Sequence, residues 1–436
     1  MNDTPAKMCN TGWTKFLRRI SPGLGIFIFV LIAGACSGQK SRSDEASKGS
    51  KVQAGAEVLL EKHLPTLRQH KVGLVMNPTA RVKGVHMLDT LLAHDIPVSA
   101  LFAPEHGFRG RAEAGERIKD GVDQQTGLPV YSLYGDTRKP TPEMLKKVDL
   151  LLFDIQDVGA RFYTYHVTLG KVIEAAARAG IPVWVLDRPN PAGGKYVAGW
   201  LLREKFRSFV GAYPIPVVHG MTMGELARMM VGESWIEHAG KAEVKVIRMK
   251  NWKREMLWPE TGLRWYPPSP NLPRFSNAYF YLGTAFFEGT NLSEGRGTDA
   301  PFLKLGSPTT NIPDSVINRL EKSAPVDIKK ITFTPRSIPG KSVHPKFEGE
   351  KVKGIRLSLK GNPDQVKPLE FGLELLRQMI KYTSSVTYKE HLFRLAGTKK
   401  IKAYLKGESQ KQSLPESWEE DVNSFKKQRK PYLLYK

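Results

Sequence analysis

Short, almost continuous apolar segments recur through the first half of the chain. They occupy residues 71–77, 98–105, 148–157 and 181–190. Strands buried on both faces of a parallel sheet show such runs, whereas a strand with one solvent face alternates. Helix-like segments lie at residues 85–95, 142–148, 169–180 and 220–234, and one more apolar run follows at 244–249. This alternation predicts an α/β domain with a mostly parallel, Rossmann-like sheet.

The second half of the chain has a different composition and no comparable series of apolar runs. Residues 265–302 are rich in Pro, Gly, Asn and Ser, and we predict a long functional loop there rather than a regular helix or a long strand. Further on, residues 353–359 resemble a strand and residues 371–382 a helix. We therefore expect the α/β domain at 51–255 and a smaller α+β domain at 256–436.

Each of the four segments ends in a polar cluster. The clusters are Asn77 at the end of the first, Glu105 and the adjacent His106 at the end of the second, Asp154 and Asp157 at the end of the third, and Asp187, Arg188 and Asn190 at the end of the fourth. Ligands of open parallel sheets bind beyond the carboxyl ends of the strands, so these clusters indicate one crevice. Turn and capping preferences explain Asn77 and Asp187 well. Because Glu105 and His106 are not preferred turn or cap residues, we interpret them as functional.

Residues 154–169, DIQDVGARFYTYHVTL, combine a carboxylate, a guanidinium and several flat rings. The side chains are those of Asp157, Arg161, Phe162, Tyr163, Tyr165 and His166. Carbohydrate sites use such groups, because aromatic faces pack on sugar C–H surfaces and Arg binds a carboxylate with two parallel hydrogen bonds. An aromatic core cluster capped by a salt bridge is the alternative.

The segment EGTNLSEGRGT, residues 288–298, places Glu288, Asn291, Glu294 and Arg296 among glycines. Glycine lets the backbone approach a ligand closely. A solvated charged turn is the alternative, but such a turn would not require the prolines and aromatic residues on either side. We therefore favour a functional loop.

The N-terminal segment has the pattern of an export signal. Basic residues at positions 15, 18 and 19 precede an apolar run at 24–35, which ends in small residues. A membrane-spanning helix needs about 20 apolar residues, so the shorter run predicts a signal peptide over residues 1–35.

Cysteine usage refines this prediction. The chain has 2 cysteines, Cys9 and Cys36, so cleavage before Cys36 leaves no internal disulfide. The stretch AGAC resembles a bacterial lipoprotein box, and we expect lipidation of Cys36, with plain secretion as the alternative. Residues 36–50 are Ser- and Lys-rich and predict a flexible tether.

The charge balance favours anionic partners. Lys and Arg total 66 against 43 Asp and Glu, a formal net charge of +23. Export makes nucleic acid an improbable partner, which leaves a membrane surface or an acidic polymer. We expect the partners to be peptidoglycan fragments, and the membrane through the lipid anchor.

Six motifs in this chain resemble the bacterial exo-β-N-acetylmuramidase family, glycoside hydrolases formerly known as an uncharacterised domain family. They are PEHG at 104–107, DIQDVGARFYTY at 154–165, LDRPNP at 186–191, PSPN at 268–271, EGTNLSEGRGT at 288–298 with the following PF, and YLLY at 432–435. The resemblance runs from about residue 57 to the C-terminus. Leu282 and residues 307–310 depart from the family pattern, which bears on local sugar stacking and fine specificity.

The resemblance implies a Rossmann-like domain, a smaller second domain, an active-site cleft between them, and release of N-acetylmuramic acid from non-reducing ends of peptidoglycan fragments. Glycoside hydrolysis commonly needs one protonated carboxyl group and a second group that stabilises or attacks the sugar cation. Our candidate for the general acid is Glu105, with its pKa raised by partial desolvation and with His106 orienting it. Asp157 and Glu294 are the candidate second groups, together with Glu288. The substrate's own acetamido group is a further option, so the stereochemistry stays open.

The remaining candidates are substrate ligands. They are Arg161, Tyr163, Tyr165, Asn190, Asn271, Glu288, Asn291 and Arg296. Arg161 and Arg296 are the candidates for the lactyl carboxylate that distinguishes muramic acid from glucosamine.

Two other functions are alternatives to glycoside hydrolysis. A metal-dependent hydrolase would use Glu105, His106, Asp157 and His166 as ligands, but the sequence has no HExxH motif, no Cys-pair spacing and no P-loop. A non-catalytic peptidoglycan- or sugar-binding lipoprotein would need the aromatic residues and arginines but not Glu105. No G-x-G-x-x-G follows the first strand, which disfavours a dinucleotide enzyme. We expect neither a metal nor a cofactor.

Overall fold

The structure is a computed structural model that describes residues 51–105, 107, 120–135, 137–408 and 413–436. The predicted signal peptide, Cys36 and the tether lie outside the described residues, as does His106. Residues 50–436 form one compact unit. No helix of the described ranges is long and apolar enough to cross a bilayer.

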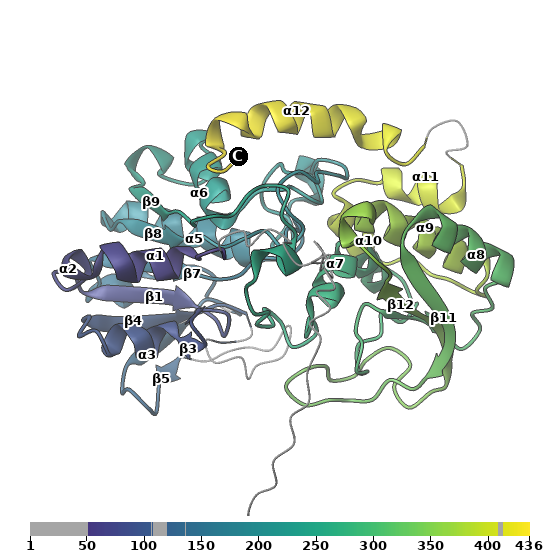
Figure 1. Cartoon of the computed structure of the whole chain (residues 1–436), viewed down its shortest axis with the longest axis horizontal. Helices are drawn as coiled ribbons and strands as arrows, with labels where there is room; N and C mark the ends of the chain where they lie inside the picture. The colour runs from purple at the N-terminus through teal and green to yellow at the C-terminus, as the bar shows by residue number, and fades with distance from the viewer. Residues whose placement is uncertain (1–50, 106, 108–119, 136, 409–412) are drawn as a thin grey trace, which may run out of the picture. The chain divides into compact units, whose positions relative to one another are not determined.

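A seven-stranded sheet organises the first half (Figure 1). Its order is β5 (Gly121–Val122), β6 (Pro129–Ser132), β4 (Val98–Ala103), β1 (Val72–Met76), β7 (Leu150–Asp154), β8 (Val183–Leu186) and β9 (Val244–Ile247). All neighbouring pairs are parallel except β5 with β6. The prediction of a mostly parallel α/β sheet is therefore confirmed.

The strand side chains alternate between two apolar cores, one on each face of the sheet. In β1, Leu74 and Met76 join the core that includes residues of the helices before β4, whereas Val75 joins the larger core on the other face. Every residue of β1 and β7 is buried. Covering helices on both faces account for the continuous apolar runs in the sequence.

Two helices of the first half precede β1, and the others lie between strands of the sheet. The helices are α1 (Gly55–Lys62), α2 (Leu64–Leu67), α3 (Met87–Leu92), α4 (Pro142–Leu145), α5 (Tyr165–Ala179) and α6 (Met223–Gly232), with a small ribbon of β2 (Arg81–Val82) and β3 (Val85–His86). Helix α5 begins at Tyr165, beyond the DIQD segment at 154–157, and packs against α4 and α6. It ends at Gly180, whose φ of 68° is left-handed.

The second half contains a three-stranded antiparallel sheet, ordered β10 (Lys304–Ser307), β12 (Val352–Leu359) and β11 (Val326–Phe333). Its helices are α7 (Phe275–Thr284), α8 (Asp314–Ser323), α9 (Pro368–Lys381), α10 (Glu390–Ala396), α11 (Lys400–Lys406) and α12 (Glu419–Arg429). The predicted strand and helix at 353–359 and 371–382 correspond to β12 and α9.

The prediction for residues 265–302 was wrong in one part. Helix α7 and a 3-10 helix at Ala285–Gly289 lie inside this stretch. Most of α7 is buried, and it packs closely on α9, where a Cβ on Gly283 would lie 2.1 Å from the Pro368 carbonyl oxygen. Burial against α9 thus overrides the low helix propensity of the aromatic residues.

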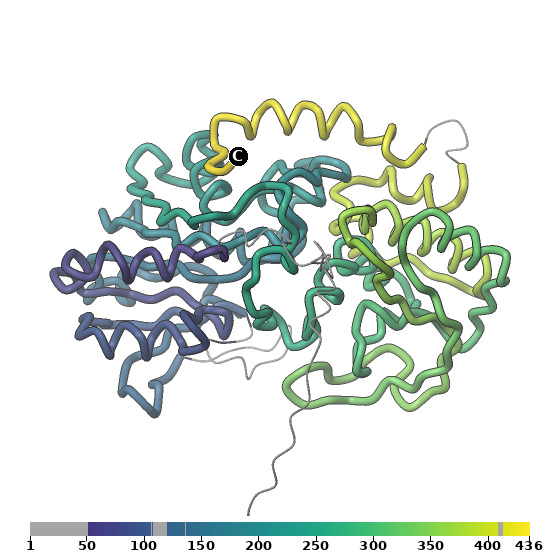
Figure 2. Tube along the Cα trace, in the orientation of Figure 1, coloured from purple at the N-terminus to yellow at the C-terminus, as the bar shows by residue number. Residues whose placement is uncertain are grey.

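The two halves share apolar packing and are joined again by the end of the chain. The larger core contains Val75 of the sheet and Phe280 and Leu369 of the second half. In Figure 2 the C-terminal residues (yellow) return to the first half, and the 3-10 helix Lys430–Tyr432 contacts α6. The predicted division at residue 255 stays a prediction.

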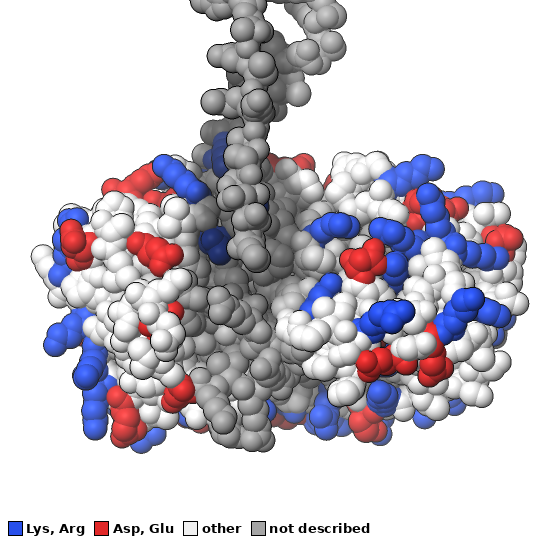
Figure 3. Space-filling model, turned by 90° about the horizontal axis from the view of Figure 1, so that it is seen from below, with Lys and Arg blue, Asp and Glu red and all other residues white. Residues whose placement is uncertain are grey.

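Charged side chains are mixed on the face shown in Figure 3. Lys and Arg (blue) alternate there with Asp and Glu (red) over the described parts of both halves. The positive excess of the chain is therefore not gathered into a single patch on the described part of this face.

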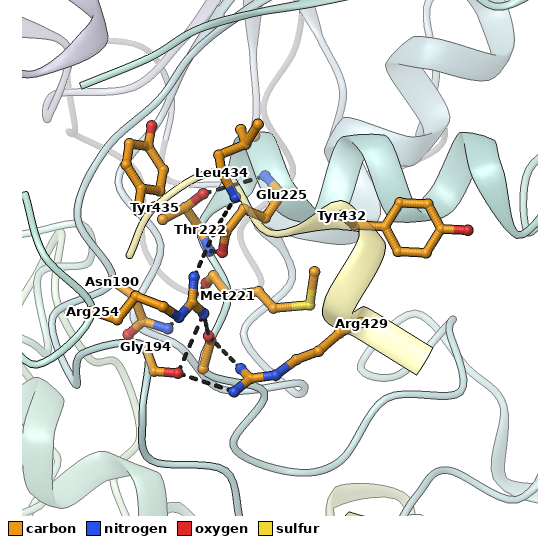
Figure 4. A network of polar contacts seen from close by, with 12 residues as sticks. Asn190, Gly194, Met221, Thr222, Glu225, Arg254, Arg429, Tyr432, Leu434 and Tyr435 are labelled. Atoms are coloured by element: carbon orange, nitrogen blue, oxygen red, sulfur yellow. Dashed lines mark hydrogen bonds and ion pairs between the residues drawn. The ribbon is translucent and has the colours of Figure 1, made fainter. Parts of the chain in front are cut away.

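A buried polar network anchors the C-terminus (Figure 4). Arg254 Nη1 lies 2.6 Å from Glu225 Oε1, which also accepts from the Leu434 amide at 2.9 Å. Tyr435 donates its hydroxyl to Asp187 Oδ2 at 2.6 Å, and Arg429 Nη1 donates to the Gly220 carbonyl at 2.6 Å. The terminal YLLY motif therefore holds the chain end against α6 and the end of β8.

Candidate active site

A cavity of about 190 Å³ contains Glu105 and draws its lining from both halves of the chain. The first half contributes Glu105, Tyr134, Phe162, Tyr163, Thr164, Tyr165, Phe209 and Val210, and the second half contributes Ser269, Leu272, Tyr281, Glu288, Arg296, Phe302, His391 and Leu395. Five of the predicted site residues, which come from distant parts of the chain, thus line one cavity: Glu105, Tyr163, Tyr165, Glu288 and Arg296.

Glu105 enters this cavity because β4 ends at Ala103, two residues earlier. Thr164 Oγ1 donates to Glu105 Oε2 at 3.2 Å, and the Tyr165 hydroxyl lies 3.4 Å from the Glu105 carbonyl oxygen. Burial, reinforced by the charge of Glu105 and a hydrogen bond to it, raises the pKa of Tyr134 well above its ordinary value. The Tyr134 hydroxyl therefore stays protonated beside the carboxylate.

Glu288 and Arg296 form an ion pair in the cavity lining. Arg296 donates to the same oxygen, Glu288 Oε1, from Nε at 3.0 Å and from Nη2 at 2.7 Å. The guanidinium carbon lies 5.2 Å from the centre of the Phe302 ring. Burial alone would lower the pKa of Arg296, but the carboxylates of Glu288 and Glu294 outweigh it and leave the pKa above its ordinary value. Arg296 is therefore a permanent cation at the cavity wall.

The two tyrosines predicted as ligands both line the cavity. Tyr165 donates its hydroxyl to the Pro268 carbonyl at 2.7 Å, which ties the helix α5 start to the loop at 268–271. The Tyr163 hydroxyl is buried and has no hydrogen-bond partner among the described residues. Burial raises the pKa of Tyr163 well above its ordinary value, so this hydroxyl remains protonated.

Glu294 lies outside the cavity lining. Its Oε2 is 2.8 Å from Lys346 Nζ, and the same ammonium group donates to the carbonyls of Phe287 and Leu292 at 2.9 Å. The Phe302 amide donates to the Glu294 carbonyl at 2.6 Å. The contacts of Glu294 thus hold the loop that carries Glu288 and Arg296, and a catalytic role for Glu294 stays a prediction.

Asp157 is also buried, and it lies outside the cavity lining. Its Oδ2 accepts from the Gly159 amide at 2.7 Å and lies 3.6 Å from His219 Nε2, while Oδ1 has no partner among the described residues. The His166 ring lies 6.3 Å from that of His219. Burial lowers the pKa of His166 to about 4, so this imidazole is neutral at physiological pH. The catalytic role of Asp157 stays a prediction.

Arg161 is not placed as the sequence suggested. Its guanidinium is fully buried outside the cavity lining and donates to three carbonyls, those of Trp200 and Ile215 at 2.7 Å and of Leu395 at 2.9 Å. Burial lowers the pKa of Arg161 to about 9. These bonds join the first half to α10, and the role of Arg161 as a substrate ligand stays a prediction.

The three asparagines also serve the protein framework in this structure. Asn190 donates to the Met221 carbonyl at 3.0 Å, Asn271 to the Lys341 carbonyl at 2.7 Å, and Asn291 to the Ser385 carbonyl at 2.9 Å. None of them is in the cavity lining. Asn271 Oδ1 is buried and has no partner among the described residues, so it alone of the three retains a free polar group next to Ser269 and Leu272.

Several lining residues were not among the predicted site residues. Tyr281 and Phe302 belong to the aromatic-rich stretch that had been singled out, and their spacing gave no reason to choose them. Tyr134 follows β6, and His391 lies in α10 with no motif around it. Burial lowers the pKa of His391, although the charge of Glu288 opposes this shift. No sequence signal distinguishes His391 from other surface histidines.

The cavity therefore combines one carboxylate, protonated tyrosine hydroxyls, an Arg–Glu pair and aromatic faces. These groups suit a sugar that carries a negative charge: rings for C–H surfaces, a guanidinium for a carboxylate and an acid for proton transfer. Among the described residues, no group of three or more His, Cys, Asp or Glu side chains is arranged to hold a metal ion.

Comparisons with known proteins bear on this site. The N-terminal and C-terminal models of the exo-β-N-acetylmuramidase NamZ match residues 72–276 and 279–435. The peptidoglycan β-N-acetylmuramidase NamZ of Bacillus subtilis (strain 168) is 38% identical over 423 residues, which cover 94% of this chain and 98% of that protein.

Two crystal structures of DUF1343 family proteins from Bacteroides fragilis NCTC 9343 have the same fold. One is 36% identical with a TM-score of 0.73 and covers 89% of this chain and 99% of its own. The other is 31% identical with a TM-score of 0.76, over 88% and 99%. The fold, the motifs and both family models agree, and the chain belongs to the exo-β-N-acetylmuramidase NamZ family.

Proposed function

We propose that this protein is an exo-acting glycoside hydrolase that releases N-acetylmuramic acid from the non-reducing ends of peptidoglycan fragments, with Glu105 as the general acid. Family membership carries the reaction class. The observation that supports the assignment of Glu105 is its position in the lining of a cavity that both halves of the chain share and that also contains the Glu288–Arg296 pair.

In this proposal Glu105 protonates the glycosidic oxygen as the bond to the leaving sugar breaks. Thr164 Oγ1 donates a hydrogen bond to the Glu105 carboxyl group, and the protonated Tyr134 hydroxyl forms a hydrogen bond with the same group. The positive charge that develops on the muramic acid ring is then met by a second group, by water or by the substrate's acetamido oxygen. The aromatic faces of Tyr163 and Phe302 lie in the same lining and provide surfaces for the sugar ring.

Arg296 is the proposed ligand of the lactyl carboxylate. Nε and Nη2 are engaged by Glu288, and Nη1 has no hydrogen bond with a described residue. A second carboxylate on Nη1 would satisfy the guanidinium and would single out muramic acid from glucosamine, which lacks the lactyl group. Glu288 in turn orients the guanidinium.

The experiment is a product assay with purified protein and a MurNAc-GlcNAc disaccharide. The parent should release free MurNAc, and Glu105→Gln should reduce turnover by about 10² or more, as expected for loss of a proton donor. Glu143→Gln, an exposed change on α4 outside the cavity, is the matched control and should retain activity. Binding of muropeptides without MurNAc release by the parent would instead support a non-catalytic sugar-binding lipoprotein.

We also propose that the protein is exported and anchored through a lipid on Cys36, facing the periplasm, where it takes part in cell-wall turnover and recycling. The basic residues, the short apolar run and the AGAC stretch before the polar tether support this. Metabolic labelling with a fatty acid should mark the parent and not Cys36→Ala. Equal labelling of both, or recovery of both in the cytoplasm, would contradict the anchor.

A further inference from the structure

A second cavity, of about 340 Å³, lies at the carboxyl ends of the central strands and shares no lining residue with the Glu105 cavity. Its lining includes Thr79 after β1, Gln156 after β7 and Arg188 after β8. The 3-10 helix Trp258–Thr261 and the loop to Tyr266 close its other side. The proposed hydrolysis at Glu105 uses none of the residues that line this second cavity.

The sheet topology places this cavity where open α/β folds bind ligands. The chain proceeds from β1 outward to β4 and β6 on one side, and then from β7 outward to β8 and β9 on the other. Adjacent strands β1 and β7 are therefore the point at which the direction reverses, and their loops separate into a crevice. Thr79 and Gln156 belong to those two loops. The backbone N–H of Gln156 donates a 3.0 Å hydrogen bond to Thr79 Oγ1.

The cavity is strongly positive, unlike the mixed surface of Figure 3. Five cationic side chains line it, those of Lys51, Arg81, Lys83, Arg188 and Arg264, against one carboxylate, that of Glu57. Glu57 Oε2 accepts from the Ala54 amide at the start of α1. Arg188 is neutralised by Asp154, through hydrogen bonds of 2.6 and 2.9 Å. The other cations form no ion pair with a described acid, so an excess of positive charge faces the space.

One residue of the cavity lining, Gln156, has an acceptor without a partner among the described residues. Gln156 is 2% exposed, and its Nε2 donates to the Asp157 carbonyl at 2.8 Å and the Pro189 carbonyl at 2.7 Å. These two bonds use both protons and determine the orientation of the amide. Oε1 has no hydrogen-bond partner among the described residues. A buried acceptor of this kind costs free energy unless a ligand or water donates to it.

Two arginines of the cavity lining, Arg81 and Arg264, pack against the ring of Tyr266. Arg81 and Arg264 place their guanidinium carbons 5.2 and 5.4 Å from the centre of the Tyr266 ring. Arg81 also donates to the Pro78 carbonyl at 3.1 Å and the Gly84 carbonyl at 2.9 Å, which leaves Nη2 for a ligand. Such restraint reduces the ordering cost of binding.

We propose that this cavity binds a small anion, which presents a carboxylate or phosphate to Arg81 and Arg264 and donates an N–H or O–H to Gln156 Oε1. The volume suits a dipeptide or a monosaccharide phosphate. The site does not depend on hydrolysis at Glu105.

Calorimetric titration of the whole protein at low salt tests the proposal with three probes: the acidic dipeptide Ala-Glu, glucose 6-phosphate and neutral N-acetylglucosamine. At least one anionic probe should bind, and the neutral sugar should not bind at this site. Binding of Ala-Glu alone identifies a carboxylate source and binding of glucose 6-phosphate alone a phosphate source, and both outcomes support the site. The Glu105→Gln variant should bind as the parent does, which separates this test from that of the hydrolase.

Substitutions then locate the binding. Arg264→Gln changes an exposed side chain and should leave the fold intact. It should raise the dissociation constant of the anionic probe at least tenfold. Arg319→Gln, an equally exposed change on α8, is the matched control and should have no effect. The proposal is overturned if neither anion binds at millimolar concentration, or if Arg264→Gln and Arg319→Gln bind the probe equally well.

Discussion

Arg296 and Glu288 meet at the cavity wall through two guanidinium nitrogens that share one carboxylate oxygen, at 3.0 and 2.7 Å. This arrangement differs from the familiar fork in which two nitrogens take two oxygens, and it leaves Arg296 Nη1 without a described protein partner. Arg296 thus binds the Glu288 carboxylate and still has Nη1 as a donor for a second carboxylate.

Arg296→Lys tests this reading. Lysine retains the charge but loses the planar set of donors, so Glu288 and the substrate carboxylate compete for one ammonium group. We expect kcat/KM on MurNAc-GlcNAc to fall roughly 10- to 100-fold, mainly through KM. Arg203→Lys, in an exposed pair with Asp421, is the control. Equal KM values for Arg296→Lys and the parent would remove Arg296 from substrate binding.

Arg161→Met should act on stability rather than on substrate affinity. The change leaves three buried carbonyls, those of Trp200, Ile215 and Leu395, without their donor. We expect the free energy of unfolding to fall by about 3 kcal/mol or more, measured by urea denaturation, with KM unchanged in the folded fraction.

The comparison variant for Arg161 is Arg203→Met. Its pair with Asp421 is half-exposed, so we expect a loss of no more than about 1 kcal/mol. A raised KM with unchanged stability in Arg161→Met would restore the role of substrate ligand that the sequence suggested.

Glu294→Gln distinguishes a framework role from a catalytic one. The substitution removes the partner of Lys346, whose ammonium group also holds the carbonyls of Phe287 and Leu292. We expect stability to fall by about 1 to 3 kcal/mol and kcat to fall less than tenfold. A loss of kcat near 10² with the parent's melting temperature would establish Glu294 as a second catalytic group.

The C-terminal anchor makes stability depend on pH through Asp187. Burial raises the pKa of Asp187 to about 6, although hydrogen bonds from Tyr435, Gly224 and Thr222 oppose the shift. The unfolded chain has the ordinary value of about 3.9. Between these values the folded state binds more protons than the unfolded state, so the contribution of Asp187 to stability decreases as pH rises from about 4 to 6.

Asp187→Asn removes this titration. The unfolding free energy of the parent minus that of Asp187→Asn should decrease by on the order of 3 kcal/mol between pH 4 and pH 7. Urea denaturation of both proteins at each pH measures it. A difference that stays constant, or that grows with pH, would show that Asp187 does not titrate in this window.

The sequence by itself determined the sheet and the position of Glu105. Continuous apolar runs specify strands buried on both faces, whatever the rest of the chain does, and a parallel strand delivers the residue after it to the ligand edge of the sheet. Glu105 follows β4 in this way, and the Glu288–Arg296 segment was recognisable from its composition and motif. These signals are local, and local patterns survive in a single sequence.

Tertiary structure decided which residues face the cavity. Arg161 and Arg296 both lie in specific motifs, yet one meets three backbone carbonyls and the other a carboxylate at a cavity wall. Helix α7 formed where low propensity argued against it, because α9 buries it, and His391 joined the cavity from more than 280 positions beyond Glu105. Each of these outcomes depends on partners that are distant in the chain, and spacing along the sequence carries no record of which distant groups fill a side chain's hydrogen bonds.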